Sequence, residues 1–160
     1  MPTYPTHLRS GTGAAHFERR PDLYSRRHGS PGDTSGAVDV IGDEARSLFA
    51  IYEGAPRAGK DADEAGPVYS AGTGGPLAVP TGRVFVRLAE QARAEDKRAQ
   101  FEAAGFDIER TPSYAPHTAW LVPRNGGVAH ALPALADLER IPDVVHVEPQ
   151  MLMGRASKTR

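Results

Sequence analysis

The chain has 160 residues, a length typical of one domain with a tail. Its formal net charge of −1 argues against a globally basic nucleic-acid-binding protein, and no apolar run is long enough to cross a membrane. The absence of cysteine excludes disulfides and thiolate metal sites. The first residues lack the apolar core of a signal peptide, so we expect a cytoplasmic protein unless the chain is a fragment of an exported precursor.

Residues 1–36 are predicted to be a disordered basic arm. Arginines outnumber acidic residues here, and Gly, Ser and Pro interrupt the sparse apolar positions, so the segment buries too little surface to offset its ordering entropy. Such an arm could bind nucleic acid or acidic surfaces, although a solvated tail is the simpler interpretation. Residues 37–79 are predicted to form short strands and a hairpin around residues 72–75, with a charged, Gly-rich linker.

Residues 80–150 carry the strongest pattern and are predicted to form the main folded domain, followed by a tail at 151–160. Helix-forming composition at 92–104, and apolar residues at helical spacing from about 130 to 140, predict two helices. Alternating apolar residues predict four strands, at 83–88, 106–111, 119–122 and 144–148. The order strand–helix–strand–strand–helix–strand is that of a ferredoxin-like α+β sandwich with an antiparallel sheet.

Alternation along the strands assigns two faces to this sheet. One face is expected under the helices and carries Val84, Val86, Leu88, Ala119, Leu121, Val145 and Val147, opposite Phe101, Leu132, Leu135 and Leu138. The other face is expected to carry Phe85, Arg87, Trp120, Val122, Val144, His146 and Glu148. This second face is too apolar for ordinary solvent-facing surface, so a cover is expected. Either residues 37–79 fold back over it or a partner binds there.

Four segments, in this order and spacing, resemble the propeptide domain of subtilisin-like serine proteases, especially the fervidolysin-type prodomain. They are VPTGRVFVRLAE at 79–90, FEAAGF at 101–106, AWLVP at 119–123 and LERIPDVVHVEPQ at 138–150. The family's closing pattern of Leu, Pro, Val and Val-Glu-Pro falls on Leu138, Pro142, Val144, Val147, Glu148 and Pro149.

The resemblance implies a non-catalytic protein that inhibits a subtilisin-like serine protease and assists its folding as an intramolecular chaperone. The open sheet face would dock on two surface helices of the protease, and the tail after the last strand would lie in the substrate groove. Carried over to this chain, the docking face is Phe85, Arg87, Trp120, Val122, His146 and Glu148. The groove-binding tail is Gln150, Met151, Leu152 and Met153.

The chain also departs from the precursors of such proteases, because no catalytic domain follows residue 150. We therefore expect a free-standing relative, a fragment of a longer precursor, or a domain reused for another role. A second interpretation is a ferredoxin-like interaction module that homodimerises through the open face. RNA binding on the sheet is disfavoured, because Phe85 and Trp120 lack the basic aromatic motif of RNA-recognition sheets.

We expect no catalytic site, cofactor or metal ion. The motif at 33–36, Asp-Thr-Ser-Gly, resembles the surroundings of a subtilase catalytic Asp, but no Gly-Thr-Ser nucleophile motif follows it. The six histidines are scattered and do not show metal-ligand spacing. His146 is the one histidine with a possible role in binding, as a pH-sensitive contact on the docking face. The simpler interpretation is a histidine that is partly exposed on a sheet face.

Overall fold

A computed structural model describes seven stretches of the chain and divides it into two compact units. Unit 1 comprises Met1–Pro5 and Thr81–Gln150, and unit 2 comprises Thr6–Pro80 and Met151–Arg160. We describe the two units separately. The described residues are 4–10, 15–28, 36–42, 48–55, 65–72, 74–125 and 127–153.

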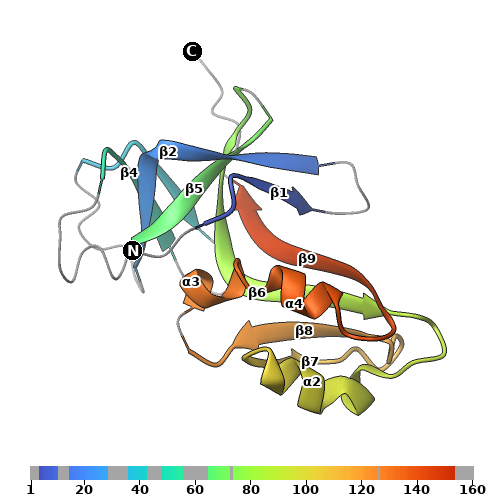
Figure 1. Cartoon of the computed structure of the whole chain (residues 1–160). Helices are drawn as coiled ribbons and strands as arrows, with labels where there is room; N and C mark the ends of the chain where they lie inside the picture. The colour runs from blue at the N-terminus through green and yellow to red at the C-terminus, as the bar shows by residue number, and fades with distance from the viewer. Residues whose placement is uncertain are drawn as a thin grey trace. The chain divides into compact units, whose positions relative to one another are not determined.

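Unit 2 is built from strands (Figure 1). Strand β4 pairs with β3 on one side and with β2 on the other, β2 also pairs with β1 and β5, and all these pairings are antiparallel. The first residues of β6 pair with β5, again antiparallel. The strands are β1 His7–Ser10, β2 Ala15–His28, β3 Asp39–Gly42, β4 Leu48–Glu53, β5 Ala65–Ala71 and β6 Leu77–Leu88.

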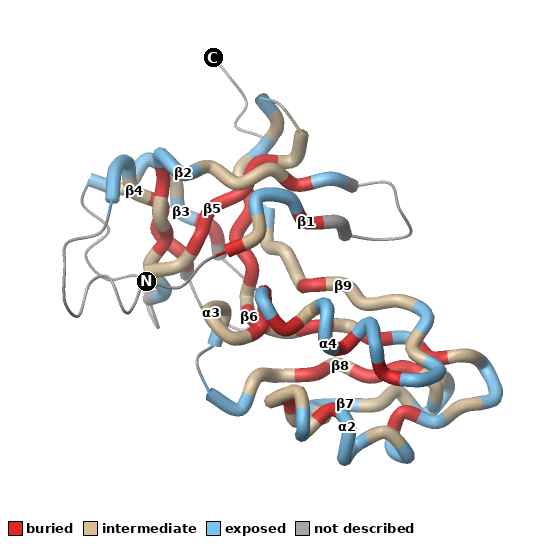
Figure 2. Tube along the Cα trace, in the orientation of Figure 1, coloured by how far each residue is buried: buried red, intermediate tan, exposed pale blue. Residues whose placement is uncertain are grey.

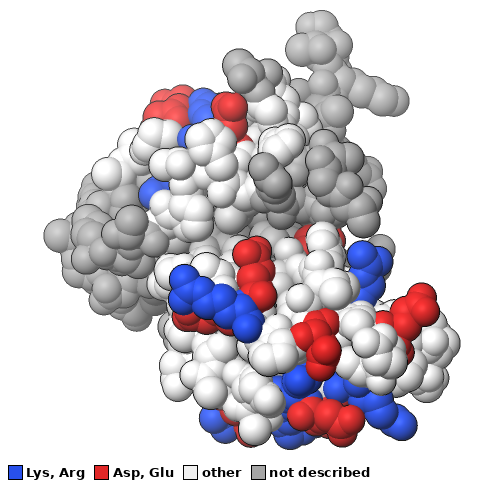
Figure 3. All heavy atoms as spheres, turned by 45° about the vertical axis from the view of Figure 1, so that its right-hand side comes forward, with Lys and Arg blue, Asp and Glu red and all other residues white. Residues whose placement is uncertain are grey.

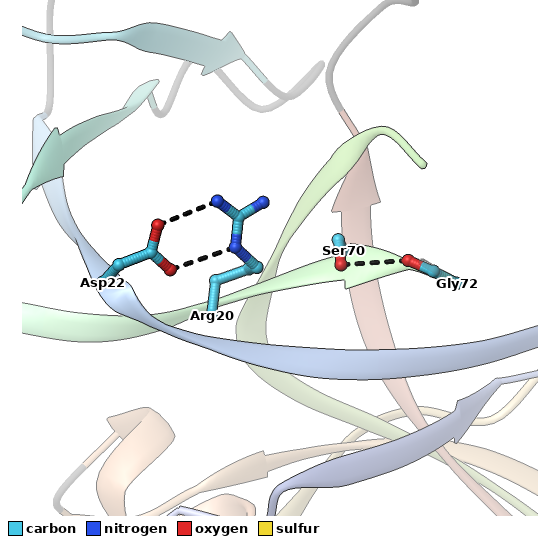
Figure 4. Close-up of polar contacts among 4 residues, drawn as sticks. All are labelled: Arg20, Asp22, Ser70 and Gly72. Carbon is cyan, nitrogen blue, oxygen red and sulfur yellow. Dashed lines mark hydrogen bonds and ion pairs between the residues drawn. The ribbon is translucent and has the colours of Figure 1, made fainter. Parts of the chain in front are cut away.

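The longest strand of unit 2, β2, is interrupted by an irregularity. Its register with β5 shifts between Arg19 and Tyr24. Within that interval Arg20 donates two hydrogen bonds to Asp22, from Nε to Oδ1 at 3.0 Å and from Nη2 to Oδ2 at 2.8 Å (Figure 4). The neighbouring strand β5 ends in a turn, where Ser70 Oγ donates to the carbonyl oxygen of Gly72 at 3.0 Å (Figure 4). These contacts lie at the irregularity of β2 and at the turn after β5.

The hydrophobic core of unit 2 gathers side chains from β2 to β6 and from the end of β9. Its described buried members are Leu23, Ile41, Phe49, Ile51, Val68 and Val79, with Leu77 and Leu152 packed against them. Aromatic and β-branched side chains such as these suit the pleated surface of a sheet. Unit 2 is therefore held by contacts between strands.

Unit 1 contains a four-strand arrangement in the order β9–β6–β8–β7, with helical segments between the strands (Figure 1). Strands β6 and β8, and β8 and β7, are antiparallel. Strand β6 enters unit 1 at Thr81, and β9 leaves it after Gln150. The elements are η1 Ala94–Lys97, α2 Arg98–Ala103, β7 Phe106–Arg110, β8 Thr118–Pro123, α3 Gly127–Ala131, α4 Leu135–Glu139 and β9 Val144–Met153.

The core of unit 1 joins alternate residues of its strands to the inward sides of its helices. Buried segments alternate with less buried ones along β6 and β8, as strand geometry requires (Figure 2). The core members are Val84, Val86, Leu88, Ala94, Phe101, Phe106, Ala119, Leu121, Ala131, Ala134, Leu138 and Ile141. Phe101 of α2 and Phe106 of β7 are fully buried and supply the largest side chains.

The predicted fold class, a ferredoxin-like α+β sandwich with two helices on its sheet, is wrong. The described residues form nine strands in a mostly antiparallel sheet structure, and each α-helix has only five or six residues. The predicted disordered arm is also wrong where the structure describes it, because β1 and the whole of the long strand β2 fall within residues 1–36. The physical reason is that β2 finds partners on both sides, so its backbone groups are satisfied and Leu23 is buried.

Two local predictions in unit 1 also need correction. The helix expected from about 130 to 140 is broken into α3 and α4, because Pro133 lacks an N–H group and cannot continue a helix. Val145, expected in the core, is 59% exposed, whereas Val144 packs against the core. Strict alternation therefore does not hold at the first residues of β9, which follow Asp143 and its positive φ of 72°. The strands expected at 83–88, 106–111, 119–122 and 144–148 are present.

Candidate docking surface

The side of β6 and β8 that faces away from the core carries an aromatic pair. Val84 and Val86 point into the core, so Phe85 between them points to the opposite face. Phe85 lies directly across from Trp120 in the antiparallel pairing of β6 with β8. Their ring centroids are 5.2 Å apart with an interplanar angle of 61°, which is the favourable edge-to-face geometry. Both side chains are partly buried.

An arginine lies over this pair. The guanidinium carbon of Arg83 is 4.7 Å from the centroid of the Trp120 ring, within the range of a cation–π interaction. The same guanidinium forms an ion pair with Glu109 of β7, on the far side of β8. Arg83 therefore spans three strands and covers part of the indole, which lowers the exposure of the Trp120 ring.

A second polar pair on the same sheet face comes from β9. Val147 packs against the core, so its neighbours His146 and Glu148 point the other way. The Nε2 atom of His146 and the Oε2 atom of Glu148 are 3.1 Å apart, with side chains 21% and 28% exposed. The Glu148 carboxylate is thus engaged within its own strand. A pH-dependent role of His146 in binding stays a prediction.

We call this surface the outer face of unit 1. It comprises Arg83, Phe85, Arg87, Glu109, Trp120, Val122, His146 and Glu148. Six of these were proposed from the sequence, and the structure brings Phe85 into contact with Trp120, and His146 into contact with Glu148. Arg87 is exposed and Val122 is partly buried.

Sequence reasoning missed two members of the outer face. Arg83 lies two residues before Phe85, so the alternation that selected Phe85 and Arg87 also pointed to Arg83. Glu109 could not be found in this way, because its ion pair with Arg83 reaches across an intervening strand. A pairing of that kind depends on strand order.

The predicted groove-binding tail forms the end of strand β9. Gln150 belongs to unit 1, where Thr81 Oγ1 donates to Gln150 Oε1 at 2.8 Å. Met151, Leu152 and Met153 belong to unit 2, and Leu152 packs against the unit 2 core. Met153 is 46% exposed. All four residues of the predicted tail therefore belong to strand β9.

Several charged side chains of unit 1 form pairs of opposite sign. Lys97 Nζ lies 3.1 Å from Asp143 Oδ2, and Arg124 Nε lies 3.1 Å from Asp107 Oδ1. Acidic and basic groups adjoin one another on the face drawn in Figure 3.

Within the described stretches, no group of three or more His, Asp or Glu side chains lies close enough to hold a metal ion. No helix in the described part of the chain is long and apolar enough to cross a membrane. The residues Asp33 to Ser35, which resemble the surroundings of a subtilase catalytic Asp, lie outside the described residues.

Comparison with protein-family models, with curated proteins and with solved structures found no match for this chain. The resemblance to subtilisin-like protease propeptides therefore rests on the four sequence segments alone.

Proposed function

We propose that this chain is a non-catalytic domain that binds a subtilisin-like serine protease through the outer face of unit 1, as an inhibitor or as an aid to its folding. The observation that carries the proposal is the Phe85–Trp120 pair, placed edge to face on the sheet surface that turns away from the core. The four propeptide-like segments supply the class of partner.

The chemistry of the outer face suits a protein partner. Aromatic and arginine side chains are the residues that contribute most to binding energy at protein–protein interfaces. Here Arg83 and Trp120 already lie in contact, so a partner would meet a preformed surface and would lose little side-chain entropy on binding. Glu148 and His146 would form a polar border beside the aromatic pair.

The test measures binding of the full chain to a panel of purified subtilisin-like proteases, by calorimetry and by inhibition of peptide hydrolysis. Trp120 is the only tryptophan in the chain, so its fluorescence offers a direct signal of binding at the outer face. Trp120→Ala is expected to weaken the affinity at least about tenfold, as for a central aromatic contact.

Tyr114→Ala is the matched control. Tyr114 is an aromatic residue of unit 1 that is 89% exposed on the loop between β7 and β8, away from the core and outside the outer face. Its removal should leave the affinity within about twofold, as for most surface contacts. Arg83→Gln serves as a second outer-face variant in case Trp120→Ala weakens the fold.

Absence of binding to every protease in the panel would contradict the proposal. Equal losses in Trp120→Ala and Tyr114→Ala would contradict the placement of the docking surface. If sedimentation instead shows a dimer that Trp120→Ala dissociates, the outer face joins two copies of the chain and the protease proposal is rejected.

A further inference from the structure

The last described residues of the chain, 151–153, are the ones predicted to enter the substrate groove of a protease. Met151, Leu152 and Met153 continue strand β9 and belong to unit 2. Leu152 packs against the cluster that contains Ile51, Val68 and the other buried side chains of that unit. Leu152 therefore ties this segment to a hydrophobic core.

Binding in a protease groove requires something different from the same residues. A peptide in such a groove adds its backbone to a strand edge of the enzyme and places alternate side chains in pockets. Leu152 cannot fill an enzyme pocket while it packs against the core of unit 2. The hydrogen bond between Thr81 and Gln150 also fixes the point at which the strand leaves unit 1.

We propose that unit 2 withholds residues 151–153 from the protease groove, so that the chain docks through the outer face while leaving the groove open. This inference rests on the proposed function, because it describes how the same docked complex is regulated. Inhibition then requires the end of β9 to leave unit 2, and any change that loosens unit 2 converts a bound chain into an inhibitor.

The first test uses the unaltered chain and two forms of one protease from the panel. One form is the active enzyme, and the other carries a peptidyl chloromethyl ketone that occupies the substrate groove. The affinity of the chain for the two forms is expected to agree within about twofold, since the docked chain does not enter the groove. A loss of tenfold or more on blocking the groove would overturn the inference.

The second test loosens unit 2 without changing the tail. Ile51 is fully buried in the unit 2 core, so Ile51→Ala weakens the packing that holds Leu152. We expect the inhibition constant for peptide hydrolysis to fall at least about tenfold, while affinity for the groove-blocked protease stays within about twofold.

A matched control removes the tail from the loosened protein. Ile51→Ala in a chain that ends at Gln150 should bind the blocked protease but should not inhibit peptide hydrolysis. Strong competitive inhibition by the unaltered chain, equal to that of Ile51→Ala, would overturn the inference and leave the docking proposal intact. No binding by any variant to either form of the protease would reject the docking proposal itself.

Discussion

The two units of this chain differ in how their hydrophobic cores are built. The described core of unit 1 has twelve buried residues drawn from strands and helices, including Phe101 and Phe106. The described core cluster of unit 2 draws its buried residues from strands alone, and Leu77 and Leu152, at the start of β6 and near the end of β9, pack against it. Leu152, which packs against the core of unit 2, also belongs to the tail that the sequence predicts to bind in a protease groove.

The largest expected effect separates the two cores directly. Phe101→Ala removes a fully buried ring from unit 1 and should lower the free energy of unfolding by about 3–5 kcal/mol. Urea unfolding followed by the fluorescence of Trp120 measures this, because the only tryptophan lies in unit 1. Ile51→Ala, in unit 2, should leave that fluorescence transition in place.

A unit 2 signal completes the comparison. Tyr24 and Tyr52 are stacked with ring centroids 5.4 Å apart, so near-ultraviolet circular dichroism has a contribution from unit 2. Ile51→Ala should shift the loss of that contribution to lower urea. If Ile51→Ala moves the Trp120 transition as far as Phe101→Ala does, the two cores unfold as one, and the comparison fails.

The next largest effect concerns Gly105, which ends α2 in unit 1. Its φ of +91° is unfavourable for any residue with a Cβ atom, at a cost of about 1–2 kcal/mol. A Cβ atom at this position would also clash with Nε2 of the His130 ring. Gly105→Ala should therefore destabilise unit 1 by more than the backbone strain alone, as measured by the Trp120 unfolding transition.

A double-mutant cycle separates strain from clash. His130→Ala removes the ring that touches Gly105, along with its 2.9 Å hydrogen bond to the carbonyl oxygen of Ala104. The double variant should be less destabilised than the sum of the two single variants, since the clash is gone while the strain remains. Strict additivity would show that His130 does not restrict this glycine.

Unit 1 was the easier unit to predict, and particular residues show why. Val84, Val86 and Leu88 alternate with Arg83, Phe85 and Arg87, so both the strand and its two faces follow from the sequence. Gly105 marked the end of a helix for a physical reason that the structure shows. The break at Pro133 was not predicted, because a proline is also acceptable in the first turn of a helix.

Unit 2 was harder because its strands are supported by distant partners. Residues 15–28 alternate poorly and contain six arginines or histidines and a proline, a composition that resembles a solvated arm. What makes this segment a strand is pairing with β4 and β5, whose residues follow 20 or more positions later. The outer face could be predicted up to its aromatic pair, whereas the Arg83–Glu109 ion pair required the strand order.

A smaller effect is expected at the turn that leads into β9. Asp143 combines a positive φ of 72° with an ion pair to Lys97, whose side chain is only 16% exposed. Asp143→Asn loses the ion pair but keeps a residue that tolerates this backbone conformation. The free energy of unfolding should therefore fall by about 1 kcal/mol. Asp143→Ala should lose about 1 kcal/mol more, because alanine does not tolerate a positive φ.

The control for this pair of variants is Asp137→Asn. Asp137 forms an ion pair with Arg140 in which both side chains are largely exposed, so Asp137→Asn should leave the free energy of unfolding almost unchanged. Thermal unfolding followed by Trp120 fluorescence measures all three variants. Equal stability of Asp143→Asn and Asp143→Ala would show that the backbone conformation at this turn is not restrictive.

The smallest expected effect lies in unit 2 and depends on pH. The hydrogen bonds from Arg20 hold the pKa of Asp22 below its ordinary value. A carboxylate whose pKa is lower in the folded state stabilises the fold above its unfolded pKa of about 4. That stabilisation is lost as the pH falls through the lower, folded value. Asp22→Asn should therefore be slightly less stable than the unaltered chain at neutral pH, and the difference should vanish in strong acid.

The Arg20–Asp22 pair lies at the irregularity of β2, so this weak effect tests whether the charge of Asp22 stabilises that part of unit 2. Both side chains are well exposed, so the pair should weaken with added salt, and it should add little to overall stability. Arg20→Gln is the matched control, since it removes the same hydrogen bonds from the other side and should abolish any further effect of Asp22→Asn. The near-ultraviolet signal of Tyr24 and Tyr52 reports the transition. The backbone N–H of Gly54 also donates to the backbone carbonyl oxygen of Asp22 at 2.8 Å. If the stability difference between Asp22→Asn and the unaltered chain does not change with pH, Asp22 acts through the shape of the bulge and not through its charge.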